Sequence, residues 1–354
     1  MTLLPAPPLT RFAGPGDLTA RQPPEERGLP RDGVRLLVAR EAGLAHARFR
    51  DLPAQLSPGD LVVVNNSATL AAEVDAVRGV RGPVVVHVGG RLDDGTWVVE
   101  LRTAPDAARS VLDGTAGESL AVAGDCSLQL LEPYPGPGSS PTGQGNRLWR
   151  CAVRGSGLTR HLLRHGRPIA YGYLDRRYPL SAYQTVFGVR PGSAEMPSAG
   201  RPFTAELLTT LVSAGIGVAT VTLHTGLSSQ EVGESPQPER FEVPATTARL
   251  VNATRAEGGR VVAVGTTVTR ALESAVRADG TVAPAAGWTE RVVSPEEPAT
   301  VVGGLITGWH DPQASHLLLV ESVVGPELTQ RAYDAALGSG YLWHEFGDSA
   351  LLLP

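Results

Sequence analysis

The sequence predicts an α/β protein whose main domain contains a mixed sheet and is interrupted by a small inserted β-barrel domain. Two patterns lead to this prediction. From about residue 200 onward, helical segments alternate with short apolar strands, an order typical of helices layered on a sheet. Between residues 76 and 155, strand-like segments follow one another with only turns between them. We therefore expect a main domain of residues 1–75 and 156–354 and an inserted domain of residues 76–155.

The N-terminal segment supplies the first elements of the main domain. Residues 1–30 are rich in Pro and Gly and are expected to form an extended arm. Residues 35–40 and 60–64 have the apolar composition of buried strands, and turn residues at 57–59 precede the second one. These two segments are the first strands that we expect in the main sheet.

The inserted domain is expected to consist of strands alone. Its first two strands, at 84–88 and 97–102, are separated by a turn rich in Gly and Asp. Three further strands are expected at 119–122, 127–131 and 148–153. The Pro-, Gly- and Ser-rich residues 133–145 are interpreted as a loop.

The second half of the chain returns to the main domain. Thr204 is the expected N-cap of a helix over 205–213, and Gly215 follows the end of that helix. The segments expected after it are a strand at 218–223, a helix at 246–257, a strand at 260–264, a helix at 268–276, an apolar run at 317–323 and a helix at 326–337.

Composition and charge exclude several classes of function. All 31 positive charges are arginine, so chemistry that requires a lysine, such as a Schiff base, is excluded. The net charge of −5 argues against a generic nucleic-acid-binding domain, which is usually basic. The N-terminus lacks the pattern of a secretory signal, and no apolar run approaches 18 residues. We expect a cytoplasmic protein that does not bind a membrane and is a monomer.

A metal site is not expected. The two cysteines, Cys126 and Cys151, are too few for a Cys-rich zinc site and match no redox motif. His161 and His165 lie four residues apart on an expected helix, but no third ligand is apparent near them. We therefore predict no metal-binding residues.

An anion site is one interpretation of residues 261–274. A buried strand, a turn of small residues and a helix follow one another there, so free N–H groups of the turn could bind a carboxylate or phosphate. Thr266 and Thr267 add hydroxyl donors. Arg270, one turn into the helix, could complete the site. The alternative is an ordinary connection in which a threonine caps the helix.

Two histidines are candidates for proton transfer. His224 follows an expected strand, where α/β proteins place ligands, and His310 lies beside Asp311, which could orient the imidazole ring. The alternative for His224 is a histidine hydrogen-bonded at a strand end. The alternative for His310 is a loop in which Trp309 packs on the core.

A basic segment is a candidate RNA-binding surface. Residues 147–177 contain eight arginines and one acidic residue, Asp175, with tyrosines between them. Such a combination suits an RNA backbone and an unstacked base. A solvated helix face, with arginine side chains covering apolar surface, is the other interpretation.

Motifs spread over nearly the whole chain occur in the order found in one known family. They are Arg31-Asp32-x-x-Arg35, Pro58-Gly59-Asp60-Leu61, Tyr183-Gln184-Thr185-Val186-Phe187, Pro197-Ser198-Ala199-Gly200, Leu223-His224-x-Gly226, Glu239-x-x-Glu242-Val243-Pro244, residues 261–274 and Phe346-Gly347-Asp348-Ser349-Ala350-Leu351. In this order they resemble the S-adenosylmethionine:tRNA ribosyltransferase-isomerases of queuosine biosynthesis. The clearest match is at 261–274, where the family reads roughly V-I-A-V-G-T-T-x-x-R-x-L-E-S.

The resemblance implies a fold, a reaction and its partners. The family has an α/β domain with an inserted β-barrel, which agrees with the elements expected above. Its members transfer and isomerise the ribosyl part of S-adenosylmethionine, used as a co-substrate without a metal, onto 7-aminomethyl-7-deazaguanine in a tRNA anticodon. The products are epoxyqueuosine in the tRNA, adenine and methionine. A monomeric transferase that binds tRNA is the expectation.

The resemblance also suggests roles for particular residues. The expected catalytic residues are His224, His310 and Glu239, with a histidine moving the proton. The expected substrate-binding residues are Gln184, Thr185, Ser198, Gly200, Gly265, Thr266, Thr267 and Arg270. The expected tRNA-binding residues are Arg154, Arg160, Arg164, Arg167, Arg176 and Arg177.

Six motifs depart from the family pattern, at residues 65–69, 168–173, 200–203, 224–230, 237–240 and 307–312. Three of these departures replace an arginine or a histidine. Ala68 stands where the family has an arginine, and Pro202 and Gln237 stand where it has histidines. Two other functions are therefore kept beside the family reaction. One is a diverged enzyme that uses S-adenosylmethionine or a related nucleoside on another acceptor, such as a small molecule. The other is a protein that binds RNA or a nucleoside without catalysis.

Overall fold

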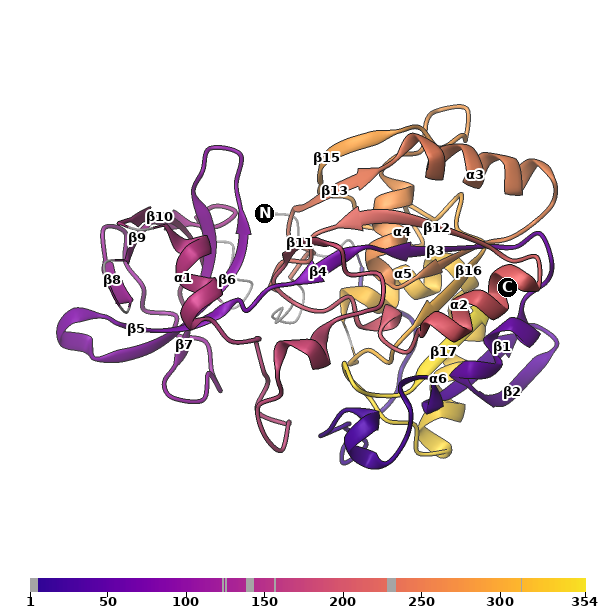
Figure 1. Cartoon of the computed structure of the whole chain (residues 1–354), viewed down its shortest axis with the longest axis horizontal. Coiled ribbons are helices and arrows are strands. Elements are labelled where there is room, and N and C mark those ends of the chain that lie inside the picture. Colours follow the sequence, from indigo (N-terminus) through magenta and orange to yellow (C-terminus); the bar gives the residue numbers. More distant parts are fainter. Residues whose placement is uncertain are drawn as a thin grey trace.

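The computed structural model confirms an α/β main domain with an inserted β-barrel (Figure 1). It describes residues 6–122, 124, 126–137, 143–155, 157–227, 234–312 and 314–354. The larger part is a nine-stranded mixed sheet with helices on both faces, and the smaller part is a closed six-stranded barrel. Part of the loop predicted at 133–145 lies outside the described residues.

Four parallel strands form the middle of the main sheet. In spatial order they are β12 (Gly217–Leu223), β3 (Leu61–Asn65), β14 (Val261–Val264) and β16 (Gly304–Thr307). Beyond β12 lie β13 (Glu239–Val243) and β15 (Ala285–Thr289). Beyond β16 lie β17 (Ser349–Leu353), β1 (Arg35–Arg40) and β2 (Gly43–Arg48). Because the central strands are parallel, their carboxyl ends meet at one edge of the sheet.

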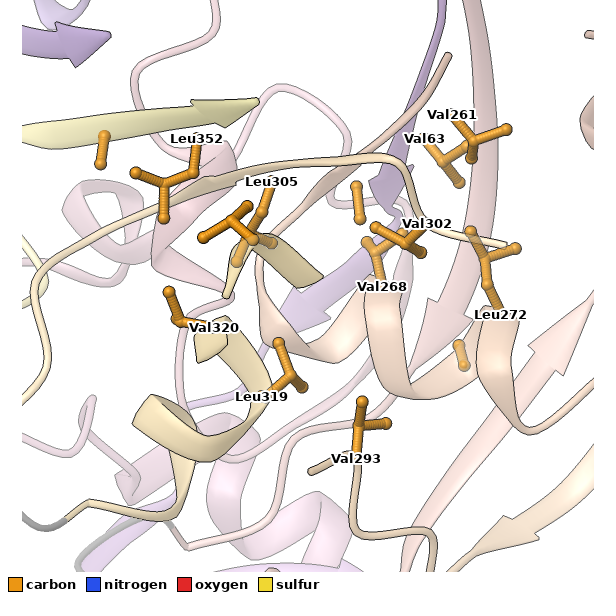
Figure 2. Close-up of a cluster of buried hydrophobic side chains, with 14 of the residues drawn as sticks. Val63, Val261, Val268, Leu272, Val293, Val302, Leu305, Leu319, Val320 and Leu352 are labelled. Atoms are coloured by element: carbon orange, nitrogen blue, oxygen red, sulfur yellow. The ribbon is translucent and has the colours of Figure 1, made fainter. Parts of the chain in front are cut away.

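Apolar side chains cover both faces of this sheet, since alternate residues of a strand point to opposite sides. One face packs against α3 (Ala245–Ala256), α4 (Thr266–Glu273), α5 (Ser315–Val324) and α6 (Pro326–Gly338). Figure 2 shows Val63 and Leu305 of the sheet together with Val268 of α4 and Leu319 of α5 in this cluster. The other face packs against α2 (Ala205–Ser213) and the 3-10 helix η3 (Phe49–Gln55).

The ends of α2 are those that the sequence predicts. The Thr204 hydroxyl accepts a hydrogen bond from the Leu207 N–H at 3.1 Å, which is N-cap geometry. Gly215 follows the helix with a positive φ of 76°. Leu207 and Leu211 are buried, and they fix the helix on the sheet.

The barrel strands span residues 73–154. In spatial order they are β10 (Leu148–Arg154), β7 (Trp97–Thr103), β6 (Pro83–Arg91), β5 (Glu73–Val77), β8 (Ser119–Val122) and β9 (Ser127–Pro133). The first strand thus begins slightly before the predicted domain start at residue 76. The short helix α1 (Leu158–His165) directs Leu158 and Leu162 into the barrel core.

A small parallel sheet joins the two parts. It consists of β4 (Ser67–Thr69) and β11 (Arg190–Ser193), which lie between the barrel and the main sheet in Figure 1. The N-terminal arm packs on the main domain, where the Thr10 N–H and hydroxyl donate to Glu321. In the described ranges, no helix is long and apolar enough to cross a membrane.

Candidate active site

A cavity of about 420 Å³ lies at the carboxyl ends of the central parallel strands. Three lining segments directly follow these strands: residues 225–227 follow β12, residues 265–267 follow β14, and residues 308–311 follow β16. Ligands of open α/β sheets bind at this position. We therefore consider this cavity the candidate active site.

A second set of lining residues comes from loops outside the central strands. The segment after α1 contributes Tyr171 and Tyr173, and the segment after β11 contributes residues 194–199. His344 and Glu345 come from the loop before β17. The fold thus brings together residues from widely separated parts of the chain.

The turn between β14 and α4 lines the cavity with Gly265, Thr266 and Thr267. Gly265 has a positive φ of 91°, and a Cβ added there would lie 3.3 Å from the Cβ of Ala199. A glycine is therefore required at this turn. The backbone N–H groups of Thr266 and Thr267 start the helix and have no acceptor within it. They are suited to bind an anionic group.

Arg270 lines the cavity but already has several acceptors. Its guanidinium forms an ion pair with the Glu239 carboxylate and donates to the backbone oxygens of Arg291, Gln237 and Thr289 at 3.1–3.3 Å. Four of its five N–H groups are thereby used. In this structure its main effect is to hold Glu239 and the segments around β13 and β15 at the cavity wall.

Glu239 also lies in the cavity wall. Its Oε1 accepts a hydrogen bond from the Gly226 N–H at 3.0 Å. Burial raises the pKa of Glu239, and the guanidinium of Arg270 and the bond from Gly226 oppose that rise. Glu239 is therefore positioned from both sides, at the ends of β12 and α4.

His310 lies in the cavity wall as a buried imidazole. Its Nε2 is 2.9 Å from the Thr307 hydroxyl, and its ring stacks on the ring of His316 at 4.8 Å. Burial, with the neighbouring His316 and His344, holds the pKa of His310 well below its usual value. Burial lowers the pKa of His316 to about 4. Both rings are therefore neutral near pH 7, and a neutral imidazole can accept a proton.

His224 does not line the cavity. Its Nδ1 is 2.7 Å from the Ser67 hydroxyl, which is itself 2.7 Å from the hydroxyl of Ser193. The ring covers Gly192, where an added Cβ would lie 2.3 Å from Nδ1. His224 thus packs on the small sheet of β4 and β11 that connects the two domains, which leaves His310 as the predicted histidine beside the cavity.

The other predicted substrate-binding residues differ in their positions. Ser198 lines the cavity. The Gln184 side-chain amide pairs with the backbone of Thr69 through bonds of 3.1 and 2.7 Å. Gly200 faces Thr185, whose Cγ2 would lie 3.5 Å from a Cβ at that glycine. Gln184, Thr185 and Gly200 therefore support the cavity wall from behind.

Four of the arginines predicted to bind tRNA have partners. Arg167 forms ion pairs with Glu73 and Asp75, and Arg177 pairs with the same buried Glu73. Arg176 pairs with Glu26. Arg154 donates to Gln129. Arg160 and Arg164 are exposed on α1, as predicted for a helix with Leu158 and Leu162 facing inward.

Several lining residues were missed by the sequence analysis. Tyr171 and Tyr173 were noticed only as aromatics within a basic segment, but they line the cavity. Glu195, His316, His344 and Glu345 were not singled out at all. The one available signal is position: Glu345 immediately precedes the matched motif Phe346-Gly347-Asp348. For the residues that the structure describes, no three side chains of His, Cys, Asp or Glu are arranged to hold a metal ion.

Comparison with known proteins gives a consistent result. The family model described as "Queuosine biosynthesis protein" matches residues 10–352. The chain is 36% identical to the S-adenosylmethionine:tRNA ribosyltransferase-isomerase of Acidiphilium cryptum, with 95% of this chain and 98% of the relative covered. It is 36% identical to the enzyme of that name from Thermus thermophilus, with coverage of 92% and 94%.

A solved structure is also similar. The crystal structure of S-adenosylmethionine tRNA ribosyltransferase from Thermotoga maritima matches with a TM-score of 0.53 and 28% sequence identity. The match covers 97% of this chain and 99% of that one. The similarity therefore extends over both the main domain and the barrel.

Proposed function

This chain belongs to the S-adenosylmethionine:tRNA ribosyltransferase-isomerase family, and from this premise we propose the reaction that it catalyses. It transfers and isomerises the ribosyl moiety of S-adenosylmethionine onto 7-aminomethyl-7-deazaguanine in tRNA. Epoxyqueuosine is formed in the tRNA, and adenine and methionine are released. S-adenosylmethionine is thus a co-substrate, and the anticodon region of tRNA is the partner.

The position and chemistry of the cavity carry this proposal. Its volume of about 420 Å³ falls in the range of about 300–1,000 Å³ that is usual for small-molecule sites. The Gly265 N–H donates to the Ile306 carbonyl at 2.7 Å, so Gly265 shapes the turn and does not bind through its own N–H. The free N–H groups of Thr266 and Thr267 support binding of the methionine carboxylate next to Ser198. Glu239 would accept a hydrogen bond from a ribose hydroxyl.

His310 is the proposed proton acceptor. A sulfonium acidifies the C–H bonds beside it, so a positioned neutral base can start the reaction. His310 is such a base, because burial keeps its pKa low and the Thr307 hydroxyl orients its ring. His224 lies against Ser67 and Ser193 instead. Its proposed contribution is to position the connection between the domains.

The proposed tRNA surface includes Arg160 and Arg164 on α1. Both are exposed, and they lie beside the barrel. Arg154, Arg167, Arg176 and Arg177 would contribute less, since each already has a partner. This pairing, together with Ala68, Pro202 and Gln237 at family motif positions, favours a second candidate function. That candidate is the same donor chemistry on another, small-molecule acceptor.

Release of adenine distinguishes these functions. The protein is incubated with S-adenosylmethionine, with and without tRNA that carries 7-aminomethyl-7-deazaguanine, and adenine is measured by liquid chromatography. The proposed reaction predicts release that requires this tRNA. Binding of S-adenosylmethionine without release would favour the other acceptor, and absence of both would favour a non-catalytic protein.

A further inference from the structure

We propose that Tyr171, Tyr173, Glu195 and Glu345 form a subsite for the sulfonium cation of the donor. The inference rests on the proposed function and deepens it, because it assigns recognition of the charged sulfur to particular residues. It also predicts how the protein distinguishes the donor from its uncharged thioether.

The charge of the cavity favours a cationic ligand. Its described lining contains four carboxyl groups, those of Glu195, Glu239, Asp311 and Glu345, and one guanidinium, that of Arg270. Arg270 is paired with Glu239. The three lining histidines add no positive charge near pH 7, because burial lowers the pKa of each. The described lining thus contains more carboxyl groups than guanidinium groups.

Two of these carboxyl groups are combined with stacked aromatic rings. The Tyr171 hydroxyl donates to Glu195 at 2.7 Å, and the Tyr173 hydroxyl donates to Glu345. The two tyrosine rings stack with centroids 5.8 Å apart, and Tyr173 stacks on His344 at 4.6 Å. Ring faces and carboxylates both attract cations, including those too alkylated to donate a hydrogen bond. A sulfonium is such a cation.

The two carboxyl groups also repel each other. Burial raises the pKa of Glu345 to about 7, and the charge of Glu195 adds to the rise, while the bond from Tyr173 opposes it. The titratable groups around Glu345 are Tyr171, Tyr173, Tyr183, Glu195 and His344. A cation bound beside Glu345 favours its ionised form, so binding below about pH 7 releases a proton.

This subsite complements the turn before α4. The N–H groups of Thr266 and Thr267 suit the donor's carboxylate, and they lie at the end of β14. The carboxyl groups of Glu195 and Glu345 lie in loops outside the central strands. Two parts of one cavity thus have opposite preferences for charge, as a donor with an anionic and a cationic group requires.

Calorimetric titration tests the proposal with two ligands that differ only at sulfur. S-adenosylmethionine carries the sulfonium, and S-adenosylhomocysteine carries an uncharged thioether. At pH 8 we expect the wild type to bind the sulfonium about tenfold more tightly, as about 1.4 kcal/mol of charge recognition would give. At pH 6 this preference falls, because Glu345 is largely protonated there.

Three variants distinguish a loss of charge recognition from a loss of the folded structure. Glu345→Gln should lose the preference, its dependence on pH and the proton release, yet bind the thioether as the wild type does, which shows that it is folded. Glu345→Asp should keep the preference. Glu257→Gln, at an exposed position after α3, is the matched control and should behave as the wild type.

The outcomes for the subsite and for the reaction are distinct. Equal binding of both ligands by the wild type, or an unchanged preference in Glu345→Gln, would overturn the subsite alone. Binding of neither ligand by the wild type would overturn the proposed function and the subsite with it.

Discussion

Arg270 shows how one buried charge can position a site. Its guanidinium contacts Glu239 and three backbone oxygens, and both charged side chains are largely buried. Removal of one partner leaves the other as an uncompensated buried charge. Loss of this ion pair is therefore expected to disturb both the cavity wall and the edge of the sheet that Arg270 contacts.

Replacement of Arg270 by alanine should lower the free energy of unfolding by about 3 kcal/mol. Urea denaturation of the purified variant measures this loss. Arg249→Ala, at an exposed position on α3, is the matched control and should change stability by less than about 0.5 kcal/mol. Equal, small effects of both substitutions would show that the Glu239 pair is not required.

The two candidate histidines should respond differently to substitution. His310→Ala should lower the rate of adenine release by about 10²–10⁴-fold, the usual contribution of a proton-transfer group. His224→Ala should retain far more activity, because its ring contacts Ser67 outside the cavity. Single-turnover assays of both variants check this. If turnover survives in the double variant, neither histidine moves the proton.

The pH dependence of the rate provides a separate test of His310. The base acts in its neutral form, and burial places its pKa well below the ordinary value. The group therefore stays deprotonated as the pH falls from 8 to 6. We expect no loss of rate from His310 in this interval at saturating donor. A titration near pH 6.5 that disappears in His310→Ala would contradict the neutral, buried imidazole.

The turn before α4 is the element on which donor binding depends most. Gly265 combines a positive φ of 91° with close contact to Ala199. Gly265→Ala should therefore lower the free energy of unfolding by more than about 1 kcal/mol and weaken donor binding. Gly338→Ala is the control, since an added Cβ at the end of α6 meets open space and φ is not positive there. That variant should be neutral or more stable, and a similar loss in both would reject the role of the turn.

The sequence predicted elements best where local signals and burial agree. The helix over 205–213 has a capping threonine, a buried apolar stripe and a following glycine, and it was predicted with its observed bounds. Five strands of the main sheet, β2, β13, β15, β16 and β17, were missed. β2 and β15 are the edge strands of this sheet, and β13 lies next to β15. In β2 and β13 polar residues interrupt the apolar pattern, so pairing with a neighbouring strand determines the structure. The apolar run at 317–323 proved to be α5, a helix buried on most sides, whose composition does not distinguish it from a strand.

The order of the predicted elements indicated the turn before α4 but misplaced His224, which follows β12 and lies outside the cavity. Gly265, Thr266 and Thr267 follow β14, which was predicted at 260–264, so their position was readable from the order of elements. His310 follows β16, a strand that was not predicted, and it was singled out only because it lies beside Asp311. Tyr171, Tyr173 and Glu345 come from loops without periodicity. Only the three-dimensional path of the chain after α1 and before β17 brings them together, and no local pattern contains that information.

At the scale of the whole molecule, the proposed tRNA surface depends on which arginines are not paired with carboxylates. The basic segment at 147–177 has a large positive charge in the sequence, but Arg167, Arg176 and Arg177 are neutralised by carboxylates. The prediction therefore concerns the two exposed arginines of α1, Arg160 and Arg164. Arg160→Ala combined with Arg164→Ala should weaken tRNA binding. The logarithm of the association constant should then fall less steeply with the logarithm of salt concentration, by about 2 in the slope.

Filter-binding titrations at several salt concentrations measure this slope. The melting temperature should not change, because neither side chain is buried. Arg109→Ala, at an exposed position on a barrel loop, is the control and should leave the slope as in the wild type. An unaltered slope in the double variant would place the tRNA surface elsewhere.

The most direct test of the central claim is mass spectrometry of tRNA nucleosides after reaction. S-adenosylmethionine labelled with ¹³C in its ribosyl carbons is incubated with the protein and tRNA carrying 7-aminomethyl-7-deazaguanine. The proposed reaction predicts epoxyqueuosine with all five labelled carbons, formed in step with adenine and formed far more slowly by His310→Ala. Unmodified tRNA after complete consumption of the donor, or no reaction with a donor that binds, would contradict ribosyl transfer to tRNA by this protein.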